Sequence, residues 1–107
     1  MALSITLPTR VGIFSTASVH IEIATDSKHF VWVIWSGKTP VASEANVPKM
    51  DIDLPSGTYR LVLTFHGPAG TQAEISITSN GVTKTRNGSI GQNGSSSQLT
   101  RQFSVSA

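Results

Sequence analysis

The sequence predicts an all-β fold, an antiparallel β-sandwich of about eight strands with jelly-roll or immunoglobulin-like topology. Three observations predict it. Apolar and polar residues alternate along most of the chain, Gly and Pro fall between the alternating runs, and no segment repeats its apolar residues with the period of a helix. Because 107 residues is the length of one ordinary domain, we expect residues 1–107 to form a single sandwich.

The clearest alternation places apolar side chains on one face of a strand and polar side chains on the other. In chain order, the segments that show it are 17–24, 49–54, 59–66, 73–78 and 99–105. This is the pattern of a strand with one face in a core and the other in water. Weaker alternation predicts short additional strands near 3–7, 11–14 and 82–86.

The segment 28–36 differs from the others because it is apolar on both faces. It carries both tryptophans of the chain, Trp32 and Trp35. Successive side chains of a strand point to opposite faces, so these two indoles lie on opposite sides of the sheet. A two-layer core has room for one of them as its main anchor. We expect Trp35, which is nearer the turn at 36–38, to lie on the outer face, at the strand end or in an interface.

Turn signals predict two hairpins. Asn80-Gly81 separates two strand-like runs, and this dipeptide supplies the two positive-φ residues that a type I′ turn requires. The connection 67–70 (GPAG) joins the segments 59–66 and 73–78 and is interpreted as a second hairpin.

A third turn, 53–59 (DLPSGTY), resembles the turn that leads into the tyrosine corner of immunoglobulin-like sandwiches. In those sandwiches the Tyr hydroxyl bonds to backbone a few residues upstream. The resemblance covers only this short segment, so it implies sandwich architecture and no family membership.

The segment 86–98 (RNGSIGQNGSSSQ) consists almost entirely of Gly, Ser, Asn and Gln around one apolar residue, Ile90. Such a composition buries too little apolar surface to offset the entropy of ordering the chain. We therefore expect a long, flexible surface loop at about 86–98.

Composition narrows the classes of partner. Charged residues make up 13% of the chain, about half of the usual share, and the net charge is only +2. The basic residues are scattered along the sequence, so we expect no nucleic-acid partner. The chain has no cysteine, which excludes disulfides and thiolate chemistry.

The sequence shows no signal-peptide pattern near its start, no lipidation signal and no apolar run long enough to span a membrane. We therefore expect a protein that is cytoplasmic or released without a cleaved signal peptide.

No motif for catalysis, cofactor binding or phosphate binding occurs, so we expect neither an enzyme nor a cofactor. Asp51 and Asp53 share one strand face and could bind Ca²⁺, but a plain acidic face is the simpler interpretation, and we assign no metal ligands. A minor hypothesis is a metal-dependent or pH-switched binder that uses His20, His29 and His66.

The leading hypothesis is a non-catalytic, lectin-like module that binds carbohydrate through an exposed aromatic and nearby polar residues. The candidate ligand-binding residues are Trp35, His29, Arg60 and His66, because an outward-facing indole offers a flat platform and the others supply hydrogen bonds. The alternative is a structural or protein-interaction domain of a virion, appendage or secretion system that assembles through an apolar sheet face. Both hypotheses predict a homo-oligomer, with a glycan or a protein as partner.

Overall fold

The computed structural model describes residues 15–107, so the strands expected near 3–7 and 11–14 lie outside the described residues. Over the described range the chain forms eight strands and no helix, which confirms the all-β prediction there. The strands are β1 (Thr16–Thr25), β2 (His29–Ser36), β3 (Thr39–Ala45), β4 (Lys49–Pro55), β5 (Gly57–His66), β6 (Gln72–Ser79), β7 (Val82–Ser89) and β8 (Ser96–Val105). Nowhere between residues 15 and 107 is there a helix long and apolar enough to cross a membrane.

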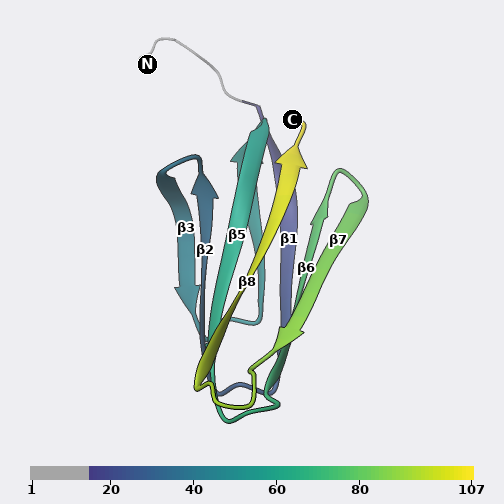
Figure 1. The fold of residues 1–107 in the computed structure, drawn as a ribbon. Helices are drawn as coiled ribbons and strands as arrows, with labels where there is room; N and C mark the ends of the chain where they lie inside the picture. Colours follow the sequence, from purple (N-terminus) through teal and green to yellow (C-terminus); the bar gives the residue numbers. More distant parts are fainter. Residues whose placement is uncertain (1–14) are drawn as a thin grey trace.

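The strands form two four-stranded antiparallel sheets. One has the order β4-β1-β6-β7 and is called the β1 sheet, and the other has the order β3-β2-β5-β8 and is called the β2 sheet. Figure 1 shows the β2 sheet lying over the β1 sheet, with the β2–β3, β4–β5 and β6–β7 connections at one end and the β1–β2, β5–β6 and β7–β8 connections at the other. Chain neighbours are therefore often in different sheets.

The core lies between the inner faces of the two sheets and forms one cluster of buried apolar side chains. Ile21 and Ile75 enter it from the β1 sheet, whereas Trp32, Leu61 and Phe65 enter it from the β2 sheet. All five side chains are inaccessible to water. Each comes from the apolar parity of an alternating segment, so the period-2 pattern of the sequence determines which face of each strand is inside.

The strand β3 was not predicted from the sequence. Its residues TPVASEA include Pro40 and several small side chains, which give a weak strand signal. The strand forms because β2 provides a partner: Val31 lies opposite Ala45 and Val33 opposite Ser43. A proline is tolerated there because β3 is at the edge of the β2 sheet.

Of the two predicted hairpins, one is confirmed and the other is wrong. Asn80 and Gly81 have φ values of 53° and 77°, and they join the paired strands β6 and β7 as expected. The connection 67–70 instead carries the chain from β5 in one sheet to β6 in the other. A hairpin is impossible there because both edges of β5 are already paired, one with β2 and the other with β8.

The long loop expected at 86–98 is mostly strand. β7 continues to Ser89 and β8 begins at Ser96, so only residues 90–95 connect them. Residues 86–89 are ordered by pairing with β6, which supplies their backbone hydrogen bonds; the polar composition of the segment does not predict this pairing. Ile90, which is 2% exposed, anchors the connection in the core, and its N–H donates to the Thr71 carbonyl over 2.9 Å.

The turn between β4 and β5 contains the tyrosine-corner contact. The Tyr59 hydroxyl donates a hydrogen bond of 2.6 Å to the Pro55 carbonyl. The Tyr59 ring is buried and stacks on Phe103, with ring centroids 5.6 Å apart. Because β4 and β5 belong to different sheets, this hydrogen bond fixes the point at which the chain crosses from one sheet to the other.

We expect Tyr59→Phe to lower the free energy of unfolding by about 1 kcal/mol, the usual net contribution of one buried hydrogen bond. The ring stays in place, so the loss reports on the hydroxyl alone. Urea denaturation measures it, with Thr58→Ala as an exposed neighbouring control. A Tyr59→Phe protein as stable as the control would show that the corner hydrogen bond contributes nothing.

We expect Gly88→Ala to lower the free energy of unfolding by roughly 1–3 kcal/mol, because an added Cβ would lie 2.6 Å from a Leu99 methyl carbon in the core. Gly91→Ala is the matched control, since a Cβ at that position meets nothing within 4 Å. Thermal and urea melts compare the two variants. Equal stability would mean that residues 86–89 are not packed against β8.

Candidate functional site

The two tryptophans of β2 lie on opposite faces of the β2 sheet, as their spacing predicts. Trp32 is 0% exposed, and its indole N–H donates to the Val47 carbonyl over 3.0 Å. Trp35 is half-buried on the outer face, and its indole N–H makes no hydrogen bond with any residue in the described range. The outer indole thus keeps both accessible surface and a hydrogen-bond donor.

A row of three side chains crosses the outer face of the β2 sheet. Trp35 on β2 lies directly opposite Arg60 on β5, and Arg60 lies directly opposite Gln102 on β8. Neighbouring strands are about 4.8 Å apart, so the row is about 10 Å long. Arg60 and Gln102 are exposed. The row therefore places an aromatic surface, a guanidinium and an amide side by side on the outer face of the sheet.

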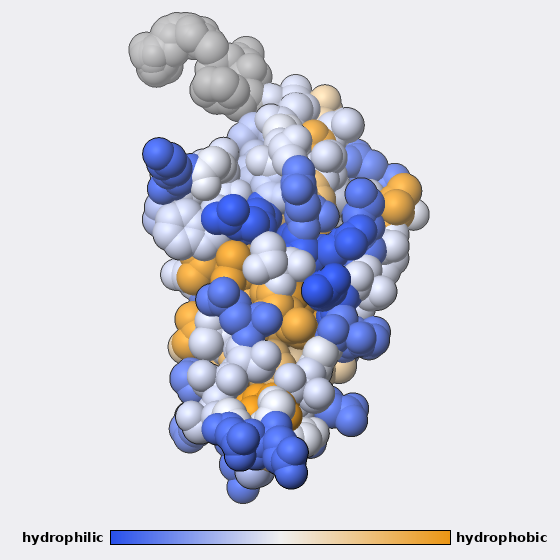
Figure 2. All heavy atoms as spheres, viewed as in Figure 1, coloured by the Kyte–Doolittle hydropathy of each residue, from blue (hydrophilic) through white to orange (hydrophobic). Residues whose placement is uncertain are grey.

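An apolar stripe continues from this row along β2. Val33 is half-buried and lies directly opposite Val62 on β5, and Val31 is 42% exposed. Figure 2 shows apolar surface over the middle of this sheet, with hydrophilic side chains on either side of it. The stripe accounts for the second apolar face of segment 28–36: it faces away from the core.

His29 and His66 lie at the other end of the same two strands. They are directly opposite each other and both are exposed. Trp35 is six positions after His29, which corresponds to roughly 20 Å along an extended strand. The four predicted site residues therefore share one sheet face but form two separate pairs, Trp35 with Arg60 and His29 with His66.

The histidine pair borders a hollow of about 510 Å³ at the end of the molecule, between the β1–β2 and β5–β6 connections. The buried Ser27 fixes this end. Its hydroxyl lies within hydrogen-bond distance of both backbone carbonyls, 2.9 Å from that of His29 and 2.6 Å from that of His66. It also accepts the two backbone N–H groups of these residues, over 3.2 and 3.3 Å. One side chain thus joins β2 and β5 where their ladder ends.

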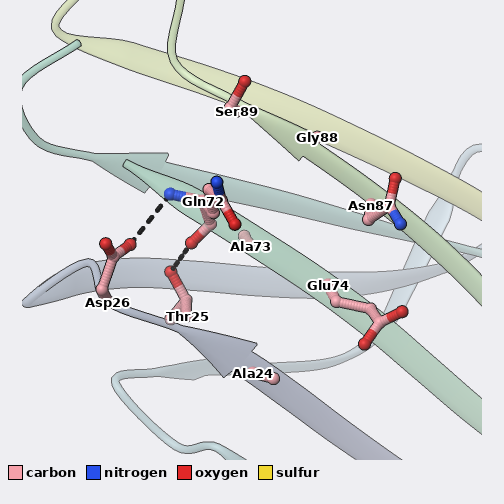
Figure 3. A pocket seen from close by; sticks show the side chains of 9 residues that line it. All are labelled: Ala24, Thr25, Asp26, Gln72, Ala73, Glu74, Asn87, Gly88 and Ser89. Atoms are coloured by element: carbon pink, nitrogen blue, oxygen red, sulfur yellow. Dashed lines mark hydrogen bonds between the residues drawn. The ribbon is translucent and has the colours of Figure 1, made fainter. Parts of the chain in front are cut away.

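A second hollow of about 660 Å³ lies across the ends of β1, β6 and β7, and no sequence signal predicted it. Figure 3 shows its lining of carboxylate, amide and hydroxyl groups. The Asp26 carboxylate accepts the Gln72 backbone N–H over 2.8 Å, and the Thr25 hydroxyl donates to the Gln72 carbonyl over 2.6 Å. The hollow offers hydrogen bonds but no aromatic platform, so we assign it no function.

His20 lies on the outer face of the β1 sheet between two carboxylates. Its Nδ1 is 2.7 Å from an Asp51 oxygen and its Nε2 is 2.8 Å from a Glu22 oxygen. The hydrogen bond to Glu22, followed by that to Asp51, raises the pKa of His20 above its ordinary value of 6.5. The same His20 contact, helped by Lys49, lowers the pKa of Glu22 below its ordinary value of 4.5.

Asp51, one of the two residues considered as Ca²⁺ ligands, is thus hydrogen-bonded to His20. Within residues 15–107, no group of three or more His, Asp or Glu side chains is arranged to hold a metal ion. The described acidic residues of this face therefore offer no assembled metal site.

Comparison with known proteins yields no match among protein-family models, curated proteins or solved structures.

The His20 contacts predict a pH dependence of stability. Because the pKa of His20 is raised above 6.5 in the folded protein, the protonated His20 contributes to the free energy of unfolding. This contribution is complete below pH 6.5 and is lost as pH rises through the folded-state pKa. The lowered pKa of Glu22 gives a contribution present above pH 4.5 and lost as pH falls. We therefore expect the urea concentration at the unfolding midpoint to decrease as pH rises from about 5.5 to about 8.

Asp51→Asn should reduce this fall because it replaces one of the two carboxylates beside His20 with an uncharged amide, which stabilises protonated His20 less. Asp53→Asn is the matched control, since Asp53 is on the same strand face and makes no hydrogen bond to His20. An unchanged pH profile in Asp51→Asn would contradict the role of this contact.

Proposed function

We propose that this chain is a non-catalytic binding domain that recognises carbohydrate through the outer face of its β2 sheet. One observation carries the proposal: the half-buried, outward-facing indole of Trp35 lies directly opposite the guanidinium-bearing Arg60 on an otherwise sparsely charged sheet face. The part of the Trp35 indole that stays accessible adds nothing to the core between the sheets. An interaction with a ligand gives that side chain a use.

Each member of the row suits a sugar. The indole of Trp35 presents an apolar face on which the C–H face of a pyranose can stack. Arg60 carries five N–H donors for hydroxyl or ring oxygens, and the Gln102 amide both donates and accepts. Because the row spans three neighbouring strands, it fits the side of a polysaccharide chain better than a single sugar.

His29 and His66 enter the proposal as a separate contact. At roughly 20 Å from Trp35, they cannot touch the same sugar unit. An extended chain lying along β2 and β5 would reach both pairs. We therefore place the main contact at Trp35 and Arg60, and a secondary contact at the histidine pair.

Oligomerisation is part of the proposal because a single site made of a few surface side chains gives weak affinity. Linking several sites in one assembly turns later binding events into intramolecular ones and raises avidity by orders of magnitude. A homo-oligomer that presents several β2 sheets outward would bind a repetitive polymer far more tightly than one protomer.

A second candidate function is assembly with a protein through the same sheet. The exposed Val31 and the facing pair Val33 and Val62 favour it, because a continuous apolar stripe beside an indole is the typical core of a protein interface. In this candidate Trp35 anchors a partner chain rather than a sugar. The two candidates differ in the ligand and share the surface.

We also propose that the two sheets form an immunoglobulin-like sandwich rather than a jelly roll. In support, the order β3-β2-β5-β8 matches the order of strands C′, C, F and G, and β1 beside β4 matches strands B and E. The buried Trp32 and the Tyr59 hydroxyl bonded to Pro55 occupy the positions that tryptophan and the tyrosine corner have in such domains. The hairpin β6–β7 would take the place of strand A.

We expect Trp35→Ala to weaken binding to a responsive polysaccharide at least about tenfold, because the stacking platform is lost. A glycan array identifies the ligand, and isothermal titration measures the change. Thr85→Ala, on the outer face of the other sheet, is the control and should bind like the unmodified protein. Binding should also change the fluorescence of Trp35, since Trp32 is inaccessible to any ligand.

A silent array, or equal binding by Trp35→Ala and the control, would contradict the carbohydrate proposal. Light scattering then tests the second candidate. A complex that Val31→Lys dissociates would support protein assembly through the stripe, whereas a strict monomer at high concentration would count against self-assembly.

A further inference from the structure

The edge strand β7 turns basic side chains toward the inside of the molecule. Lys84 lies opposite Ile77 and Arg86 opposite Ile75, and both isoleucines are buried on the inner face of the β1 sheet. Lys84 and Arg86 therefore point to the inner side of their sheet, yet both are exposed. They are about 7 Å apart along the strand. The space between the sheets is thus open to solvent along this edge.

The facing edge strand β8 adds a third cation. Arg101 lies opposite the fully buried Leu61, so its side chain also starts from the inner face. Its Nε is buried and has no hydrogen-bond partner within the described range. A buried guanidinium nitrogen without an acceptor is costly, because its hydration is lost and not replaced. We call Lys84, Arg86 and Arg101 the basic edge.

A hollow of about 240 Å³ adjoins the basic edge at the end nearer the β6–β7 turn. Its lining combines apolar and hydrogen-bonding groups: Ile77, Ser79, Asn80, Val82, Lys84, Phe103 and Ser104. Val82 is exposed although it is apolar. Figure 2 shows hydrophilic side chains gathered over β8 and along its side toward β7.

The basic edge lacks compensating charge. Within residues 15–107, the ion pairs are those of His20 with Glu22 and Asp51, on the other face of the β1 sheet. Three of the eight Lys and Arg residues of the chain thus share one edge without a carboxylate partner in the described part of the chain. Such an arrangement raises the local concentration of anions.

We infer that the basic edge binds oxyanion groups, sulfate or carboxylate, carried by an acidic polysaccharide. Charge complementarity favours this ligand: the spacing of the cations along β7 suits anionic groups repeated along a polymer, and Arg101 adds a third positive charge at the same edge. Nucleic acid is less well matched. Proteins that bind it neutralise about six to ten phosphates and often stack bases on aromatic side chains, whereas this edge has three cations.

This inference extends the proposed carbohydrate function but uses other residues. Gln102, the last member of the row that begins at Trp35, is the chain neighbour of Arg101 on β8. The side chains of Gln102 and Arg101 point to opposite faces of the β2 sheet, so a polysaccharide that crosses the sheet from Trp35 and passes around the β8 edge would reach the basic edge. The neutral contact at Trp35 and the charged contact at the basic edge can each be removed without the other.

The test measures binding of a sulfated polysaccharide and of its unsulfated parent by titration, and repeats the sulfated series at rising salt. We expect Lys84→Gln with Arg86→Gln to weaken the sulfated complex at least about tenfold and to leave the neutral one unchanged. Affinity for the sulfated polymer should fall with salt. Lys38→Gln, in the β2–β3 turn, is the control for Lys84→Gln alone.

Several results would overturn the inference: no binding of the sulfated polymer, an equal loss in Lys38→Gln and Lys84→Gln, or tighter binding of DNA or polyphosphate than of the sulfated polymer. Self-association of the double variant with unchanged polymer binding would also overturn it, because inward-pointing charges then serve only to prevent pairing of edge strands. Trp35→Ala separates the two proposals. Loss of sulfated binding in the double variant but not in Trp35→Ala would support the basic edge as a contact separate from Trp35.

Discussion

The burial of Trp32 between the two sheets is the constraint on which the other features of this structure depend. Its ring fills the middle of the core, and its N–H reaches the carbonyl of Val47 in the connection between β3 and β4. Because side chains alternate along a strand, placing Trp32 inside forces Trp35 outside. Pairing of β2 with β5 then places Arg60 beside Trp35. The candidate surface is therefore a consequence of how the core is filled.

The sequence predicts those parts of the fold that depend on local pattern. Strands with strict alternation, such as β1 and β5, were expected within a few residues of their observed bounds. The Asn80-Gly81 turn was expected because its backbone requirement is local. The parts that the sequence does not predict depend on a neighbouring strand. β3 forms because it pairs with β2, and β7 extends to Ser89 because residues 82–89 all pair with β6.

The same distinction holds for the candidate site. Spacing within β2 predicts the outward position of Trp35 and its distance from His29, but only the register between β2 and β5 places Arg60 beside Trp35 and His66 beside His29. The basic residues of this edge appear scattered in the sequence, since Lys84 and Arg86 are far from Arg101. The fold brings them to one edge because β7 and β8 lie at the same side of the two sheets. Scattered charge in a sequence therefore does not exclude a charged patch on a β protein.

The Tyr59 hydroxyl bond joins the end of one sheet to the start of the other, and Trp32 and Val47 make a similar link through the connection that follows β3. Neither sheet can unfold without breaking these hydrogen bonds and the core packing that also hold the other sheet. The two layers should therefore melt as one cooperative unit, with no intermediate in which a single layer persists. A domain of this kind resists local opening in its centre, so its exposed edges and end loops are the parts left to vary.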